Sequence, residues 1–382
     1  MANLPVVGVP STIARDEDVS VPRRGGLPVL AVTEHEAWQR HEGPIVRRTV
    51  DWETRKAERK ATARRDGLAD AYGRKMANLR ISVLHACNLS CAYCHAEGQQ
   101  HERRRMTPGE IARVARLAAC FGARKVKLTG GEPLLREDID EIVRLVRPHV
   151  DELSMTTNGV RLAEWAHALR DAGLDRVNVS VDTLDAATFA EIRGADVLPV
   201  VLEGIEAAKR AGLPVRVNMV IQAETADGDI ARMRRYIADR GLQGLQLIEL
   251  HGPRGVERGD YFRTHHRDLR PIEAALRKEA ILVTRRAMHA RPAYTVREAG
   301  RDVPIEIVRP YRNARFCAHC TRLRLTSDGD LKPCLMRTDN HVNVLDAMRR
   351  GASDEELEDM ILHANYLREP YWLPKEDADG GA

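Results

Sequence analysis

The sequence predicts an α/β fold, in which a partial (β/α)6 TIM-like barrel precedes a C-terminal module that carries a second group of cysteines. From about residue 79 onward, short apolar runs alternate with longer helical patterns. This alternation is typical of βαβ units that build a parallel sheet. Six strands joined by helical crossovers favour an open barrel over a closed barrel of eight strands. In such sheets the chemistry lies at the carboxyl ends of the strands.

The expected elements follow one another in regular order along the chain. Strands are predicted at residues 80–84, 125–129, 153–157, 176–181, 215–220 and 245–250. Helices are predicted between them at 108–120, 136–146, 162–172, 200–211 and 230–240. Further on come extended pieces at 294–297 and 305–310, and a helix at 354–364. We therefore expect a charged, partly disordered extension at 1–67, the barrel at 68–285, and the C-terminal module with a polar tail at 286–382.

The composition excludes several classes of protein. Hydrophobic residues make up 43% of the chain and charged residues 30%, as in ordinary globular proteins. The net charge of +4 is too small to indicate a nucleic-acid-binding protein, and 4% aromatic residues argue against a stacking platform for single strands. No apolar run reaches the length of a membrane span, and no signal peptide is recognisable. We expect a cytoplasmic protein with no nucleic-acid or membrane partner.

The chain has seven cysteines, and six of them fall into two groups. In a reducing cytosol such clustering points to metal binding rather than to disulfides. Cys120 stands alone after an apolar stretch, and we expect it to be buried in a helix.

The first group, Cys87, Cys91 and Cys94, has the spacing C-x3-C-x2-C and directly follows the first predicted strand. Three thiolates on one tight loop can bind three corners of a [4Fe–4S] cube, which leaves one iron open to a small-molecule ligand. A zinc site completed by His85 or His95 is the alternative on spacing alone.

The position of this loop resembles the radical SAM superfamily, in which S-adenosyl-L-methionine (SAM) binds the open iron. Tyr93 stands between the last two cysteines, and Gly130-Gly131-Glu132-Pro133 ends the second predicted strand. There the superfamily has its methionine-binding turn. The resemblance implies that a reduced cluster cleaves SAM to a 5′-deoxyadenosyl radical, which takes a hydrogen from the substrate.

The second group consists of Cys317, Cys320 and Cys334. His319 could complete a Cys3His zinc site, but it lies between the paired cysteines and is expected to point away from them. We favour a second [4Fe–4S] cluster with an open iron. Arg322 and Arg324 follow at alternate positions, so in an extended segment they share one face beside the cluster, where guanidinium groups suit phosphate.

From about residue 70 to 358 the chain resembles the MoaA family, the GTP 3′,8-cyclases that open molybdenum cofactor biosynthesis. The matching segments are 70–74, 79–82, 125–135, 156–159, 175–182 and 316–329. The resemblance implies that the radical takes hydrogen from C3′ of GTP and that C3′ then bonds to C8 of guanine. It also implies that the second cluster binds the guanine base, that an external donor supplies electrons, and that a homodimer is possible.

Carried over position by position, the family's site residues form two sets. The triphosphate contacts are Arg80, Lys127, Thr156, Arg216, Arg322 and Arg324. The SAM contacts are Tyr93, Gly131, Ser180 and, through its backbone, His251. The sequence itself supports the first set, because charged residues inside barrel strands are unusual unless they face an anion.

The chain departs from the family at a few positions. Bacterial members have arginine where Gln246 stands, frequently have arginine at Lys127, and have methionine at His251. The family ends in Gly-Gly, whereas here Ala382 follows those glycines. A related radical SAM enzyme that acts on another nucleotide, metabolite or peptide is therefore the alternative, and a non-catalytic zinc or iron–sulfur scaffold is a third.

Overall fold

The computed structural model describes residues 56–95, 104–252, 256 and 259–373 of the 382-residue chain. Residues 1–55 of the predicted, partly disordered extension and residues 374–382, with the end of the predicted polar tail, lie outside the described residues. The last part of the N-terminal extension forms helix α2 (Lys56–Asp66), in which Arg64 pairs with Glu358 at 2.6 Å. None of the helices in the described ranges is long and apolar enough to cross a bilayer.

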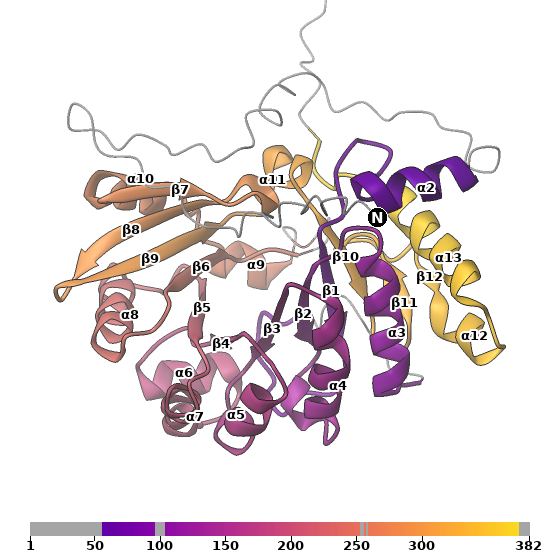
Figure 1. Cartoon of the computed structure of the whole chain (residues 1–382). Helices are drawn as coiled ribbons and strands as arrows, with labels where there is room; N and C mark the ends of the chain where they lie inside the picture. Colours follow the sequence, from indigo (N-terminus) through magenta and orange to yellow (C-terminus); the bar gives the residue numbers. More distant parts are fainter. Residues whose placement is uncertain (1–55, 96–103, 253–255, 257–258, 374–382) are drawn as a thin grey trace, which may run out of the picture.

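The barrel consists of parallel strands that pair with their neighbours in the sequence (Figure 1). They are β1 (Asn78–Ser82), β2 (Lys125–Thr129), β3 (Glu152–Thr157), β4 (Arg176–Ser180), β5 (Val215–Ile221) and β6 (Leu245–Glu249). The predicted partial barrel is confirmed, and each observed strand overlaps its prediction.

The C-terminal strands extend this sheet at both edges. Strand β10 (Arg322–Leu325) pairs in parallel with β1, and β9 (Arg301–Val308) pairs in parallel with β6. The remaining strands are antiparallel additions: β7 (Leu282–Arg285), β8 (Pro292–Glu298), β11 (Asp330–Lys332) and β12 (Val342–Asn343). The result is one 12-stranded sheet in the described part of the chain. The division at residue 285 stays a prediction.

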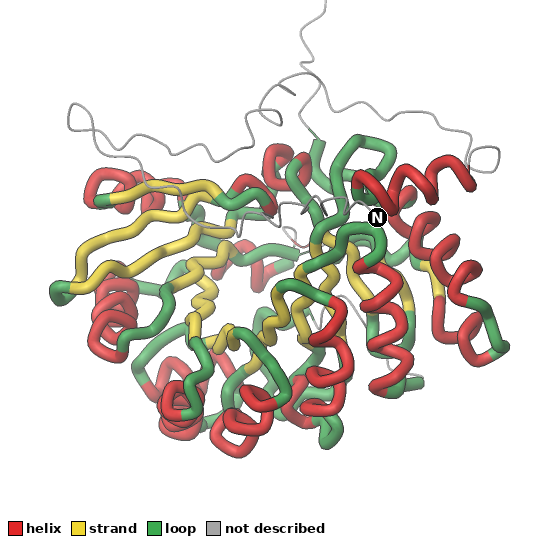
Figure 2. The backbone as a smooth tube through the Cα atoms, viewed as in Figure 1, coloured by secondary structure: helices red, strands yellow, loops and turns green. Residues whose placement is uncertain are grey.

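Most helices cover the convex side of the sheet, as Figure 2 shows. Those of the barrel are α3 (Pro108–Ala119), α4 (Ile139–Val146), α5 (Leu162–Asp171), α6 (Ala186–Arg193), α7 (Leu198–Arg210) and α8 (Asp227–Arg240). The later ones are α9 (Asp260–His265), α10 (Arg270–Glu279), α11 (Ala314–Ala318), α12 (Val344–Arg349) and α13 (Asp354–Tyr366). The short helix α6 was not predicted. Cys120 was predicted to be buried in a helix, but it caps the end of α3 and is exposed.

Alternation along the strands separates the core from the concave side. In β1, Leu79 and Ile81 are buried beneath the helices, whereas Arg80 between them faces the other way, since successive strand residues point to opposite faces. The same alternation runs through β5 and β6. Polar and charged side chains are therefore directed into the hollow of the barrel.

Candidate active site

A cavity of about 1830 Å³ occupies the concave side of the sheet. This is larger than the pockets that hold a single small molecule, which are about 300–1,000 Å³. Every site residue predicted from the sequence lines it: Arg80, Cys87, Cys91, Tyr93, Cys94, Lys127, Gly131, Thr156, Ser180, Arg216, His251, Cys317, Cys320, Arg322, Arg324 and Cys334. The structure thus brings the predicted residues together, while their individual roles stay predictions.

The first cysteine group lies on the loop after β1. Cys87 and Cys94 are exposed to the cavity, and Cys91 is half-buried. Two side-chain N–H groups reach sulfur atoms of this group: Asn158 Nδ2 lies 3.8 Å from Cys87 Sγ, and Arg193 Nη1 lies 3.5 Å from Cys91 Sγ. Because a thiolate accepts hydrogen bonds far better than a thiol, such donors fit cysteines that bind metal.

The turn after β2 supports this loop. Glu132 is fully buried and accepts hydrogen bonds from Thr157 Oγ1 and from the backbone N–H of Asn158, both at 2.7 Å. Burial raises the pKa of Glu132 to about 7, and these hydrogen bonds oppose the rise. The carboxyl group thereby joins the end of β2 to the end of β3, directly beside the cysteine loop.

The second cysteine group lies around α11 and the start of β10. The backbone N–H of Trp372 lies 3.4 Å from Cys317 Sγ. His319 Nδ1 lies 2.9 Å from the carbonyl of Arg315, one turn back in its own helix. His319 therefore contacts its own helix, and the expectation that it points away from the cysteines stays a prediction.

Both groups suit a cluster in which each iron takes one thiolate. Among the described residues, no three His, Cys, Asp or Glu side chains are grouped closely enough to hold a single metal ion. A [4Fe–4S] cube spreads its cysteine ligands over separate irons. The donor set, three cysteines on one wall of a shared cavity in each case, fits two such clusters.

The two groups lie at opposite ends of the hollow. Strands β1 and β10 are parallel, so their amino ends lie at the same edge of the sheet. Cys320 precedes the first residue of β10, whereas Cys87 follows the last residue of β1. Five strand residues at about 3.3 Å each put on the order of 15 Å between these two edges.

Positive side chains line the space between the two ends. The strand register sets Arg80 opposite Arg324 on one side and opposite Lys127 on the other. On the far wall Arg216 projects from β5. Burial lowers the pKa of Lys127 well below its ordinary value, and Arg176 and Arg80 lower it further. Burial also lowers the pKa of Arg216, to about 10, although Glu306 opposes this. The field in the hollow therefore favours an anion.

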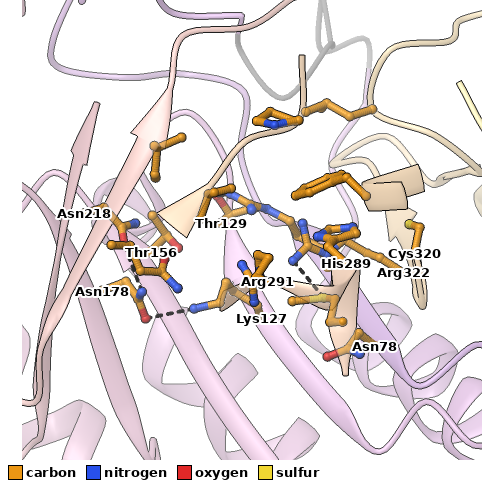
Figure 3. A pocket seen from close by; sticks show the side chains of 18 of the residues that line it. Asn78, Lys127, Thr129, Thr156, Asn178, Asn218, His289, Arg291, Cys320 and Arg322 are labelled. Atoms are coloured by element: carbon orange, nitrogen blue, oxygen red, sulfur yellow. Dashed lines mark hydrogen bonds between the residues drawn. The ribbon is translucent and has the colours of Figure 1, made fainter. Parts of the chain in front are cut away.

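Figure 3 shows how these side chains lie. Lys127 Nζ donates to Asn178 Oδ1 at 2.9 Å, and Asn178 Nδ2 donates to Asn218 Oδ1 at 3.0 Å. Thr156 stands opposite Asn178 in the β3–β4 register. A row of polar groups thus crosses the floor of the hollow.

Glu306, Arg291 and His289 are among the cavity residues that were not predicted from the sequence. Glu306 is buried and lies 3.2 Å from Arg216 and 2.8 Å from Arg291. Burial would raise the pKa of Glu306, but Arg291 and Arg216 hold it at about 2. His289 is buried, has a positive φ of 64°, and stacks on Phe316 with 3.8 Å between ring centroids. Glu306 could have been predicted, because it is a charged residue inside an otherwise apolar strand. The sequence around His289 has no comparable signal.

The predicted SAM contacts lie near the first cysteine group. The Tyr93 hydroxyl donates to Asp182 Oδ2 at 2.7 Å, and burial raises the pKa of Tyr93 well above its ordinary value. His251 Nδ1 lies 3.0 Å from the carbonyl of Glu249, and its ring lies 5.7 Å from that of His95.

Comparison with protein families divides the chain in two. Residues 81–237 match the model of the radical SAM superfamily, and residues 243–373 match the model described as Molybdenum Cofactor Synthesis C.

Individual proteins resemble the chain over most of its length. A protein of Pyrococcus abyssi named "Probable GTP 3′,8-cyclase" is 47% identical over 305 residues, which are 80% of this chain and 99% of that protein. One of the same name from Thermococcus kodakarensis is 47% identical over 306 residues, 80% of this chain and 99% of that protein. Among solved structures, SuiB of Streptococcus suis bound to S-adenosylmethionine aligns with a TM-score of 0.55 at 16% identity, over 79% of this chain and 76% of SuiB. That structural likeness supports the fold.

Proposed function

The chain belongs to the family of radical SAM GTP 3′,8-cyclases, and we propose that it converts GTP to its 3′,8-cyclic form with the residues of this one cavity. With SAM bound, the first [4Fe–4S] cluster would supply the electron that releases a 5′-deoxyadenosyl radical. This radical takes hydrogen from C3′ of GTP, C3′ bonds to C8 of guanine, and the radical left on the base takes up one electron and one proton from outside. The enzyme is thus a lyase of molybdenum cofactor biosynthesis.

The cysteines and their neighbours hold the two clusters in this proposal. Cys87, Cys91 and Cys94 bind the cluster that meets SAM, and the buried Glu132 turn keeps their loop in place. We assign Tyr93, Gly131, Ser180 and His251, which line the same cavity, as the SAM contacts. Cys317, Cys320 and Cys334 bind the second cluster, whose open iron takes the guanine base.

The triphosphate lies between the clusters, and one observation carries this assignment. The register of three neighbouring strands sets the positive side chains of Arg80, Lys127 and Arg324 side by side in the hollow. Burial lowers the pKa of Lys127, and the neighbouring cations Arg176 and Arg80 lower it further. A polyphosphate would bring negative charge to these cations, and guanidinium forks bind its oxygens in pairs. The remaining contacts of this set are Thr156, Arg216 and Arg322.

The distance between the cysteine groups supports a substrate that spans the hollow. The separation of the two edges, on the order of 15 Å, leaves room for a base bound at one cluster and SAM bound at the other to approach the same ribose. When the base is bound at one end of the hollow and SAM at the other, the ribose is held between them. The hydrogen transfer then takes place between two groups that are already oriented.

We also propose an external one-electron donor and a cytoplasmic location. Each SAM cleavage consumes one electron, which must enter from outside the cavity. A homodimer stays a prediction.

The decisive experiment incubates the anaerobically reconstituted, reduced protein with SAM and GTP. We expect 5′-deoxyadenosine together with a cyclised GTP product, and iron and acid-labile sulfide that match two clusters. ATP in place of GTP is the control and should give little cyclised product. SAM cleavage without consumption of GTP would contradict the proposal and favour a related enzyme with another substrate.

A further inference from the structure

The end of helix α6 is built against the first cysteine loop. The backbone N–H of Ser90 donates to the carbonyl of Arg193 at 3.2 Å, and that of Ala92 donates to the carbonyl of Ile192 at 3.1 Å. Gly194, which ends the helix with φ 74°, lies so close to the loop that a Cβ there would stand 2.2 Å from Ser90 Oγ. The loop and the helix end therefore form one packed unit.

The side chain of Arg193 enters this unit and is nearly fully buried, with 4% exposure. Its Nη1 lies 3.5 Å from Cys91 Sγ, and its Nη2 forms an ion pair with Asp182 Oδ2 at 2.8 Å. The guanidinium carbon lies 5.6 Å from the centre of the Tyr93 ring. Burial of an arginine side chain costs free energy unless its charge is paired. The ion pair with Asp182 offsets part of this cost, and a charge kept buried in this way is a candidate for a functional role.

Asp182 fixes the direction of this arginine. Its carboxylate is 2% exposed on the side chain and also accepts from the Tyr93 hydroxyl at 2.7 Å and from the backbone N–H of Val220 at 2.9 Å. With these partners the carboxylate has little freedom to turn. Arg193 is therefore held with one nitrogen on Asp182 and another on the cysteine sulfur.

The second cysteine group has arginines of its own. There Arg74 Nη1 donates to the carbonyl of Cys317 at 2.9 Å, and Arg368 donates to the carbonyl of Cys320 and also interacts with the Cys320 side chain. Backbone N–H groups donate to sulfurs of this group too, that of Trp372 among them. Arginine thus lies at a cysteine in both groups, and Arg193 is the arginine that contacts the group predicted to meet SAM.

We propose that Arg193 is a positioning residue that raises the reduction potential of the first cluster by donating a charged hydrogen bond to the Cys91 thiolate. This inference rests on the proposed cluster at Cys87, Cys91 and Cys94. A reduced cluster carries more negative charge on its sulfurs, so a cationic donor stabilises it more than the oxidised form. Loss of the arginine also leaves the Asp182 carboxylate without its cation, which shifts the potential in the same direction.

The test is a redox titration of the holoenzyme, followed by electron paramagnetic resonance of the signal that SAM perturbs. We expect Arg193→Met to move the potential of this signal to more negative values, and Arg193→Lys, which keeps the charge, to move it less. The signal that SAM does not perturb should stay at its wild-type potential in both variants. An unchanged potential in an Arg193→Met protein with full iron content would overturn the inference.

A matched control is Arg136→Met. Arg136 is also buried, donates to the carbonyl of Val83 at 2.8 Å and pairs with Asp138, but has no sulfur contact in the described structure. We expect this variant to lose stability without a shift in potential; an equal shift would overturn the inference. If Arg193→Met loses iron, the double variant Asp182→Asn with Arg193→Gln removes both charges and retains polar partners. It must still show a negative shift, smaller than that of Arg193→Met because the Asp182 charge is removed as well, and a potential equal to or above the wild-type value would overturn the inference.

The outcome is separable from the proposed function. Wild-type protein that holds no SAM-sensitive cluster would defeat the function itself. Wild-type protein with such a cluster, whose potential is indifferent to Arg193, would defeat this inference alone.

Discussion

Gly131 lies against the backbone of Ala86, so close that a Cβ on Gly131 would stand 2.2 Å from the Ala86 carbonyl oxygen and 2.2 Å from that of His85. The neighbouring N–H of Glu132 donates to the same Ala86 carbonyl at 2.9 Å. The turn after β2 and the cysteine loop after β1 are therefore in backbone contact, with no side chain between them.

This contact predicts the effect of Gly131→Ala. The added methyl group must displace backbone rather than a flexible side chain, so the cysteine loop has to move. We expect reduced iron content and loss of SAM cleavage, measured by iron analysis and by 5′-deoxyadenosine formation. Gly109→Ala is the control, because a Cβ there meets nothing within 4 Å, and it should leave both measurements unchanged. Wild-type SAM cleavage by Gly131→Ala would contradict the expectation.

Replacement of Lys127 by Met should weaken GTP binding. The variant keeps the length of the side chain but removes one cation from the hollow, which should raise KM for GTP roughly 10- to 100-fold. Lys209→Met on the outer helix α7, where Lys209 pairs with Glu206 at 3.1 Å, is the control and should leave KM unchanged. Steady-state kinetics of GTP consumption decide the matter, and equal KM values would remove Lys127 from the triphosphate site.

The Cys317→Ser variant should separate the two halves of the reaction. Without this thiolate the second cluster loses a ligand and the guanine base loses its anchor, while the first cysteine group stays intact at the other end of the hollow. We expect 5′-deoxyadenosine to form while cyclisation of GTP is lost. Cys120→Ser, at the exposed end of α3, should behave as wild type. Undiminished GTP cyclisation in Cys317→Ser would defeat the model with two clusters.

Glu306→Gln should destabilise the fold in a way that depends on pH. The folded-state pKa of about 2 lies below the ordinary value of 4.5, so the carboxylate contributes stability above pH 4.5 and loses it as pH falls towards 2. The shift corresponds to about 3 kcal/mol at pH 7 and about 1 kcal/mol at pH 3. Urea unfolding of the wild-type protein and of Glu306→Gln at several pH values should show that the difference between their free energies of unfolding becomes smaller as the pH falls. A difference that stays constant with pH would argue against the ion pairs with Arg216 and Arg291.

The local sequence pattern was enough to predict the barrel strands and the residues that face the cavity. It could not predict contacts between residues that lie far apart in the sequence. Alternation in β1 and β10 correctly directs Arg80, Arg322 and Arg324 to one face, because strand geometry fixes it within a few residues. The pairing of β10 with β1 has no local signal, since a parallel partner can lie anywhere in the chain. The same holds for Arg193, whose partners Cys91 and Asp182 come from other elements. Its helix is short and weakly amphipathic, which explains why it was missed.

The pairing of β1 with β10 also determines at which stage of chain synthesis the active site can form. Asn78 donates to Thr321 Oγ1 at 2.7 Å across 243 residues of sequence. Contacts of such long range form late, because the loop between them must close first. A nascent chain that has released β1 to β6 but not yet β10 therefore has an open sheet edge beside β1, and its first three cysteines are accessible to the proteins that insert iron and sulfide. The cavity is completed only near the end of translation, when β10 has been made and can pair with β1.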